Sequence, residues 1–245
     1  MPEVNLNVRL LEKTENAVAL IYAACRQCYS QKFAGELFDE KADDAVKQAD
    51  FIRRVVASGH ESPLEHAKFT FAIEGVSRAL THQLVRHRIA SFSQQSQRYV
   101  RETNFDYIVP PSIAEDKGLK EEFAHTMDLI QASYNKLLER FKDKGRVGER
   151  ANQDVRFVLP QAAETKIVVT MNCRELIHFF HQRCCARAQW EIKRLAFVML
   201  EIVQKELPEV FGEVGAKCDT LGYCPEGESF TCGKYPLKDK VLAKK

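Results

Sequence analysis

The stretch from Arg86 to Tyr99 concentrates side chains that can bind an anion and a ring. Three cationic residue types in a row, Arg86, His87 and Arg88, are followed by a run rich in serine and glutamine that leads to Arg98. Arginine forms paired hydrogen bonds to phosphate, and short hydroxyl and amide groups can read the edges of a base. The stretch therefore predicts a site for a phosphate joined to a heterocycle, and the alternative is a solvated basic helix end.

Cysteine is the second residue type that could carry chemistry. The chain has eight cysteines: Cys25, Cys28, Cys173, Cys184, Cys185, Cys218, Cys224 and Cys232. Cys25 and Cys28 have redox-motif spacing but lie in a helical pattern, which favours two core thiols. The last three are irregularly spaced without a C-x-x-C pair, so we predict no metal site. With no export signal, we expect reduced thiols and a cytoplasmic protein.

The composition is that of a globular protein. Of 245 residues, 45% are hydrophobic and 29% are charged, which excludes a disordered or fibrous chain. A formal net charge of +2 provides no global field that attracts nucleic acid or a membrane surface. No apolar run, including the one at residues 195–200, approaches the roughly 20 residues that span a bilayer. We therefore expect neither nucleic acid nor membrane as a partner.

Hydrophobic periodicity predicts the elements that must position these residues. It predicts helices at about residues 18–28, 43–58, 77–86, 119–141 and 172–207, the last interrupted near Cys184, and strands at 66–73 and 167–171. Asn172, with Glu175 three residues on, has the pattern of a helix N-cap. We expect an α+β fold, a helix-rich single domain over residues 1–211 with a small antiparallel or mixed sheet. Residues 212–245 are expected to form an irregular extension that contains cysteine and glycine.

Several segments together resemble the flavin-dependent thymidylate synthases. Arg86-His87-Arg88, followed after seven residues by Ser96, matches the R-H-R-x7-S signature of that family. The further matching segments are Gly59-His60-Glu61-Ser62-Pro63-Leu64-Glu65-His66, Arg156-Phe157-Val158-Leu159-Pro160, Asn172-Cys173-Arg174-Glu175-Leu176, Arg183 and Ala188-Gln189-Trp190-Glu191. They occur in the family's order over roughly residues 17–207.

The resemblance implies an activity and an assembly. Members of this family methylate dUMP to dTMP, with methylenetetrahydrofolate as one-carbon donor and NADPH as reductant through bound FAD. They are homotetramers in which several subunits build each active site. The rival hypothesis from the residues alone is a non-catalytic nucleotide- or RNA-binding module that uses residues 86–98, although aromatic residues that could stack bases are sparse there.

The resemblance also implies a role for individual residues. The residues expected to bind FAD are Ser62, Arg86, His87, Arg88, Gln94, Asn172, Cys173, Arg174 and His178. The residues expected to bind dUMP are Gln83, Leu84, Val85, Arg86, Gln94, Gln95, Ser96, Gln97, Arg98, Arg156 and Arg183. Arg183 matches the catalytic arginine that promotes ionisation at N3 of the uracil ring. The chain departs from some members at Gln94, where they carry an acid, and at His178, where they carry asparagine.

Overall fold

The computed structural model describes residues 3–39 and 45–243. The described chain divides into two compact units, and the expectation of a single domain over residues 1–211 stays a prediction. Unit 1 consists of the residues up to Asn7, Ala72–Arg86 and Phe92–Val168, and unit 2 consists of Val8–Phe71, His87–Ser91 and the residues from Val169 onward. The predicted boundary at residue 211 stays a prediction.

A four-stranded antiparallel sheet confirms the α+β class. Its strand order is β1-β2-β4-β3, with β1 at Asn7–Lys13, β2 at Lys68–Ser77, β3 at Ala90–Gln94 and β4 at Glu164–Asn172. The predictions for β2 and β4 are confirmed, and β1 and β3 were not predicted. Side chains of β4 alternate between buried and more exposed positions, which is the two-residue period of a strand with one buried face.

The helices account for most of the remaining described residues. They are α1 (Ala17–Gln27), α2 (Ala34–Asp39), α3 (Ala45–Ala57), α4 (Arg78–Leu84), α5 (Pro111–Ala114), α6 (Lys117–Asp143), α7 (Glu149–Val155), α8 (Cys173–Arg183), α9 (Trp190–Glu206), α10 (Pro208–Phe211), α11 (Lys217–Leu221) and α12 (Lys238–Leu242), with 3-10 turns η1 (Ser62–His66) and η2 (Arg156–Val158). The predicted helices correspond to α1, α3, α4, α6 and the pair α8 and α9; residues 43 and 44 of one prediction lie outside the described residues. No described helix is both long and apolar enough to span a bilayer.

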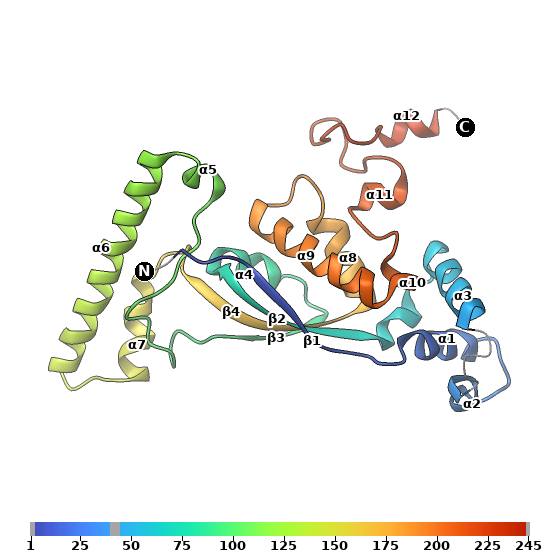
Figure 1. The fold of residues 1–245 in the computed structure, drawn as a ribbon, viewed down its shortest axis with the longest axis horizontal. Coiled ribbons are helices and arrows are strands. Elements are labelled where there is room, and N and C mark those ends of the chain that lie inside the picture. The colour runs from blue at the N-terminus through green and yellow to red at the C-terminus, as the bar shows by residue number, and fades with distance from the viewer. Residues whose placement is uncertain (1–2, 40–44, 244–245) are drawn as a thin grey trace. The chain divides into compact units, whose positions relative to one another are not determined.

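In unit 1 the long helix α6 packs against α5 and α7 (Figure 1). Asp116 caps its start, because the side chain accepts a hydrogen bond from the Leu119 N–H at 2.9 Å. Met127 on α6 contributes to a buried cluster that also contains Phe105, Tyr107, Val109 and Ala163. This apolar cluster gives unit 1 a core of its own.

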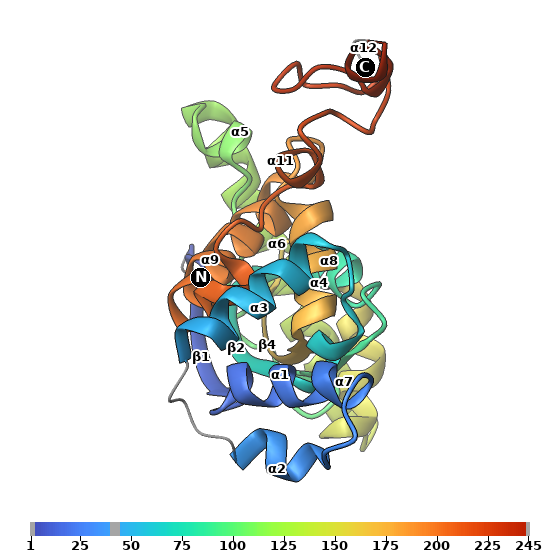
Figure 2. The same ribbon diagram turned by 90° about the vertical axis from the view of Figure 1, so that its right-hand side faces the viewer.

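In unit 2, α1 lies between α2 and α3 (Figure 2), and α8 packs beside α9. A chain of edge-to-face aromatic contacts runs through its core: ring centroids are 5.8 Å apart for Phe69 and Phe211, 6.1 Å for Phe211 and Phe180, and 5.6 Å for Phe180 and Phe179. Phe179 in turn contacts the ring of His87 at 5.0 Å. The aromatic core thereby fixes one residue of the predicted site.

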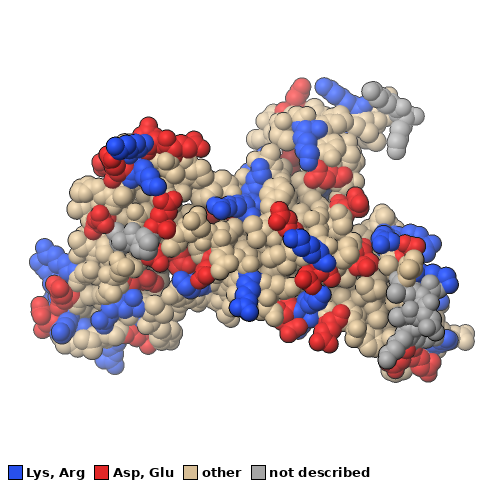
Figure 3. Space-filling view, in the orientation of Figure 1, with Lys and Arg blue, Asp and Glu red and all other residues tan. Residues whose placement is uncertain are grey.

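Basic and acidic side chains are mixed over the face drawn in Figure 3. Among the described residues drawn in colour there, neither sign covers a broad continuous area. A nucleic-acid interface requires lysine and arginine gathered on one face or along one helix, so this face does not present such an interface.

Candidate functional site

The start of α8 builds one wall of a polar pocket in unit 2. Asn172 caps the helix, since its Oδ1 accepts a hydrogen bond from the Glu175 N–H at 2.8 Å. This confirms the predicted N-cap and fixes the direction in which the first turn presents its side chains. The pocket has a volume of about 360 Å³ and is lined by Glu61, Glu65, Ile89, Asn172, Arg174, Glu175, Ile177, His178 and His181.

The Arg174 guanidinium is neutralised within this pocket. Its Nη1 donates to Glu65, and its Nε lies 3.5 Å from an oxygen of Glu61. Glu61 is the N-cap residue of the 3-10 turn η1 and Glu65 lies within the turn, so this turn positions the arginine. The two carboxylates raise the pKa of Arg174 through the hydrogen bond and their charge. An anionic ligand would have to compete with these carboxylates for Arg174.

His87 is buried behind the pocket and contacts two charged side chains. Its Nδ1 lies 3.2 Å from Oε1 of Glu175, and the Nε of Arg183 donates to its Nε2 at 3.1 Å. Only 3% of the His87 side chain is exposed. Burial, together with the neighbouring charges of Arg183 and His178, lowers the pKa of His87 to about 4. His87 is therefore neutral near pH 7.

The neutral ring can have only one tautomer in this arrangement. Because the Arg183 N–H points at Nε2, that nitrogen must be the acceptor, and the proton sits on Nδ1. Nδ1–H then donates to the Glu175 carboxyl group. The result is a chain of hydrogen bonds from Glu175 through His87 to Arg183, which holds the guanidinium of Arg183 in one orientation.

We expect the depressed pKa of His87 to make stability fall as the pH falls. Above pH 6.5, which is the pKa of the ring in the unfolded chain, His87 is neutral in both states and does not change the free energy of unfolding. Between pH 6.5 and about 4 the unfolded chain takes up a proton that the folded chain does not, so the free energy of unfolding decreases, by at most about 3 kcal/mol.

Urea unfolding at pH 7 and pH 4.5 measures this effect. His87→Gln removes the titrating group, so the difference in stability between the two pH values should shrink relative to the parent chain. His125→Gln, at an exposed position on α6, is the matched control and should leave the difference unchanged. If His87→Gln and the parent chain lost the same free energy of unfolding between pH 7 and pH 4.5, the lowered pKa of His87 would be contradicted.

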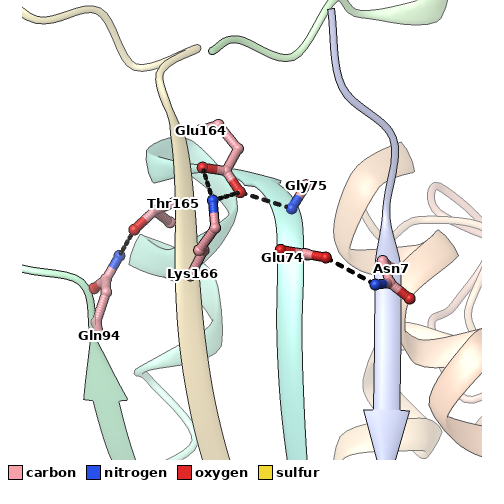
Figure 4. Close-up of polar contacts among 7 residues, drawn as sticks. All are labelled: Asn7, Glu74, Gly75, Gln94, Glu164, Thr165 and Lys166. Carbon is pink, nitrogen blue, oxygen red and sulfur yellow. Dashed lines mark hydrogen bonds and ion pairs between the residues drawn. The ribbon is translucent and has the colours of Figure 1, made fainter. Parts of the chain in front are cut away.

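In unit 1, Gln94 ties three elements together at the end of β3. Its Nε2 donates to Thr81 Oγ1 on α4 at 3.1 Å and to Thr165 Oγ1 on β4 at 3.2 Å. Figure 4 shows the contact with Thr165 and, beside it, the contacts of Glu164 with Lys166 and with the Gly75 N–H. The amide of Gln94 thus fixes where the following loop begins.

The loop after β3 carries an unsatisfied donor. Nη2 of Arg98 pairs with Glu149, and the Arg98 N–H donates to Ser96 Oγ at 3.2 Å. The Nε of Arg98 is buried and has no hydrogen-bond partner among the described residues. A buried N–H without a partner is costly, and an acceptor on a ligand would remove that cost.

A pair of arginines lies close to this loop. Burial, followed by the charge of Arg156, lowers the pKa of Arg78, so the positive charge of Arg156 acts on the Arg78 guanidinium. Arg78 Nη1 also lies 3.5 Å from the Gln95 carbonyl oxygen. Two adjacent cations favour a bound anion. Sequence analysis assigned Arg156 but missed Arg78; the signal was its four-residue spacing with His82 and Arg86.

The remaining predicted residues differ in how accessible they are. The guanidinium groups of Arg86 and Arg88 are exposed and make no hydrogen bond or ion pair with the described residues. Ser62 and Val85 are exposed, Gln83, Gln95 and Gln97 are partly buried, and Leu84 is fully buried.

Cys173 is not brought to the pocket. Its side chain is fully buried and its N–H donates to the Ala67 carbonyl at 2.8 Å. Burial raises the pKa of the Cys173 thiol far above its ordinary value, so it is not poised as a nucleophile. Glu175, by contrast, was predicted only as part of a helix-capping pattern, although it contacts His87 directly.

Comparison with known proteins identifies similar sequences. The family model described as "Thymidylate synthase complementing protein" matches residues 9–209. The chain is 54% identical over 244 residues to a protein named flavin-dependent thymidylate synthase from Nitratidesulfovibrio vulgaris, covering 98% of this chain and 100% of the relative. Proteins of the same name from Clostridium tetani and Pyrococcus abyssi are each 44% identical, over 97% of both chains and 91% of both chains respectively.

Proposed function

The chain belongs to the flavin-dependent thymidylate synthase family, and we propose that it forms dTMP by reductive methylation of dUMP. We propose FAD as the flavin, methylenetetrahydrofolate as the one-carbon donor and NADPH as the reductant. When bound, the flavin would pass reducing equivalents from NADPH to the one-carbon unit.

The observation that carries the catalytic proposal is the fixed guanidinium of Arg183. Its Nε donates to a neutral, buried His87 at 3.1 Å. A cation held in one orientation stabilises a negative charge that develops beside it, because no reorganisation is needed during the reaction. We assign Arg183 to the uracil ring, where its charge would favour loss of the N3 proton.

The pocket of unit 2 supports a flavin site. It is a polar cavity at the start of α8, where the helix dipole favours an anion, and it is lined by Asn172, Arg174 and His178. At about 360 Å³ it is at the small end of ligand pockets, so one part of FAD fits and the rest needs other residues. We propose Ser62, Arg86, Arg88 and Gln94 for these further contacts. His87, which the resemblance also assigned to FAD, is proposed instead to orient Arg183, and Cys173, being buried, is left out.

The loop of unit 1 supports the nucleotide site. The unsatisfied Nε of Arg98 and the neighbouring cations Arg78 and Arg156 favour a phosphate. We propose that Gln83, Arg86, Gln94, Gln95, Ser96 and Gln97, with the backbone at Leu84 and Val85, complete the contacts to dUMP.

The assembly is also a proposal. From the family to which the chain belongs, we propose a homotetramer with active sites shared between subunits, in the cytoplasm. The rival hypothesis of a non-catalytic nucleotide- or RNA-binding module is set aside, because the chain is an enzyme by its family and the face in Figure 3 lacks a broad basic area.

Arg88→Ala is expected to weaken the binding of FAD. The Arg88 guanidinium makes no hydrogen bond or ion pair within the described chain, so its loss removes a ligand contact without breaking an internal one. A charge-assisted hydrogen bond to a phosphate or ring acceptor is worth about 10- to 100-fold in the dissociation constant. Fluorescence titration of the flavin-free protein measures it. Lys47→Ala on α3 is a control for loss of one surface charge, and an unchanged affinity in Arg88→Ala would remove Arg88 from the site.

The proposed function is tested with the purified chain. We expect a yellow protein whose released flavin is FAD, and dTMP formation that requires dUMP, methylenetetrahydrofolate and NADPH together. Omitting each component in turn shows which are needed. A colourless protein that cannot be loaded with FAD, or dTMP formation without NADPH, would contradict the proposal.

A further inference from the structure

Five of the eight cysteines line a single cavity in unit 2 whose lining includes none of the residues assigned to flavin or nucleotide, although it shares His181 with the pocket at the start of α8. The cavity has a volume of about 200 Å³. Cys184 and Cys185 come from the turn between α8 and α9, Cys218 lies on α11, and Cys224 and Cys232 come from the segment that follows. Three parts of the chain therefore bring their thiols to the same space, which their irregular spacing in the sequence did not predict.

Four of the other side chains at this cavity are cationic. Arg187, Lys193, Lys217 and Lys234 line it, against the single carboxylate of Glu226. Arg187 pairs with Glu226 and lies over the ring of Phe230 at 4.4 Å. Such cations offset the negative charge of a metal bound by several thiolates. Burial and then the charge of Asp219 raise the pKa of Cys218, so a metal has to displace the proton of this thiol when it binds.

The segment that carries three of these cysteines has almost no core of its own. From Lys217 to Ala243 the structure describes every residue, and Cys224 is the one buried side chain among them. Polar contacts hold the segment in place: the Cys224 N–H donates to the Pro236 carbonyl at 2.7 Å, and Lys234 forms an ion pair with Asp219 at 2.6 Å. Segments that bury so little apolar surface are ordinarily stabilised by disulfides or by a metal.

The thiols surround a space and do not yet meet at one point. Among the described residues, no three Cys, His, Asp or Glu side chains are arranged as ligands of one ion. The sulfur atoms that bind an iron–sulfur cluster stand farther apart than those that bind one ion, because the cluster fills the space between them. To bind a single ion, the cysteine side chains have to rotate inward.

We propose that Cys185, Cys218, Cys224 and Cys232 hold a metal centre in this cavity through four thiolates. The shared chemistry is a thiophilic metal, present as one zinc ion or as an iron–sulfur cluster. Binding releases the four thiol protons to solvent. Cys184 is left out: it is the buried C-cap of α8, and consecutive residues at a helix end point in different directions. The centre would fasten residues 217–237 to the end of α8.

The test is the metal content of the untagged full-length chain, purified without oxygen. Zinc, iron and acid-labile sulfide are measured per chain, since flavin absorption would obscure a simple spectrum. We expect about one zinc per chain, or iron with an equal amount of sulfide. The first result identifies the single ion and the second identifies the cluster. If the chain is isolated without metal, Co²⁺ is titrated into the reduced protein, and the visible bands of a tetrahedral thiolate complex, to the red of flavin absorption, are expected.

Substitutions identify the ligands. Cys218→Ser and Cys224→Ser should each lose the metal, and trypsin should then cut after Lys234 faster than in the parent chain. Cys28→Ser, at an exposed thiol outside the cavity, and Cys184→Ser should retain metal. The proposal is overturned by a chain that has neither metal nor Co²⁺ bands, by disulfides among these cysteines, or by metal that persists in the Cys218→Ser, Cys224→Ser double variant.

Discussion

Arg183→Ala should fold, keep its flavin and still be reduced by NADPH, yet form dTMP about 100- to 1,000-fold more slowly. That is the usual cost in kcat of removing one preorganised group that stabilises a developing charge. The flavin should stay because Arg183 is assigned to the uracil ring, whereas Asn172, Arg174 and His178 line the pocket assigned to the flavin. Stopped-flow reduction by NADPH and a dTMP assay separate the two half-reactions.

Two further variants make this experiment decisive. Arg183→Lys keeps the charge but loses the Nε–H that donates to His87, so it should recover only part of the rate. Arg194→Ala, at an exposed arginine on α9, controls for the loss of a positive charge nearby and should form dTMP at the parent rate. Formation of dTMP at the parent rate in Arg183→Ala would remove Arg183 from catalysis, and loss of flavin from that variant would place the residue in the flavin site instead.

Local sequence patterns predicted the parts of the fold that depend on near neighbours. The cap at Asn172 is such a part, because donor and acceptor lie three residues apart. Strand β3 was not predicted, since Ala90–Gln94 is rich in small polar residues; it is a strand because it pairs with β4, about seventy residues away. Tertiary pairing overrode weak local propensity there.

In the candidate site, too, contacts between residues that are distant in the sequence could not be predicted. A family resemblance could assign His87 to a ligand, but its contacts come from Glu175 and Arg183, which are 88 and 96 residues away in the chain. The cavity lined by cysteines is a comparable case, since Cys185 and Cys218 line the same space only when α11 packs on α8. Spacing along the sequence carries no information about such contacts.

His87→Ala should lower the rate of dTMP formation about 10- to 100-fold, although His87 is buried behind the reacting groups. The substitution removes the acceptor that orients Arg183 and the donor to Glu175. Misplacing a catalytic group by about 1 Å can cost 100-fold. It also leaves the buried Glu175 without this partner, which should lower the free energy of unfolding by about 1–3 kcal/mol. Thermal unfolding therefore accompanies the assay, and rates are compared at a temperature where both proteins are folded.

A double-mutant cycle decides whether His87 acts through Arg183 or through the flavin. If its role is to orient Arg183, His87→Ala should change the rate little once Arg183 is already alanine, because the group that it positions is gone. His87→Gln should retain more activity than His87→Ala, since an amide can donate to Glu175 and accept from Arg183 at the same time. Equal losses from His87→Ala in both backgrounds, together with weaker FAD binding, would show that the ring serves the flavin directly and that the hydrogen bonds from Glu175 to Arg183 do not carry catalysis.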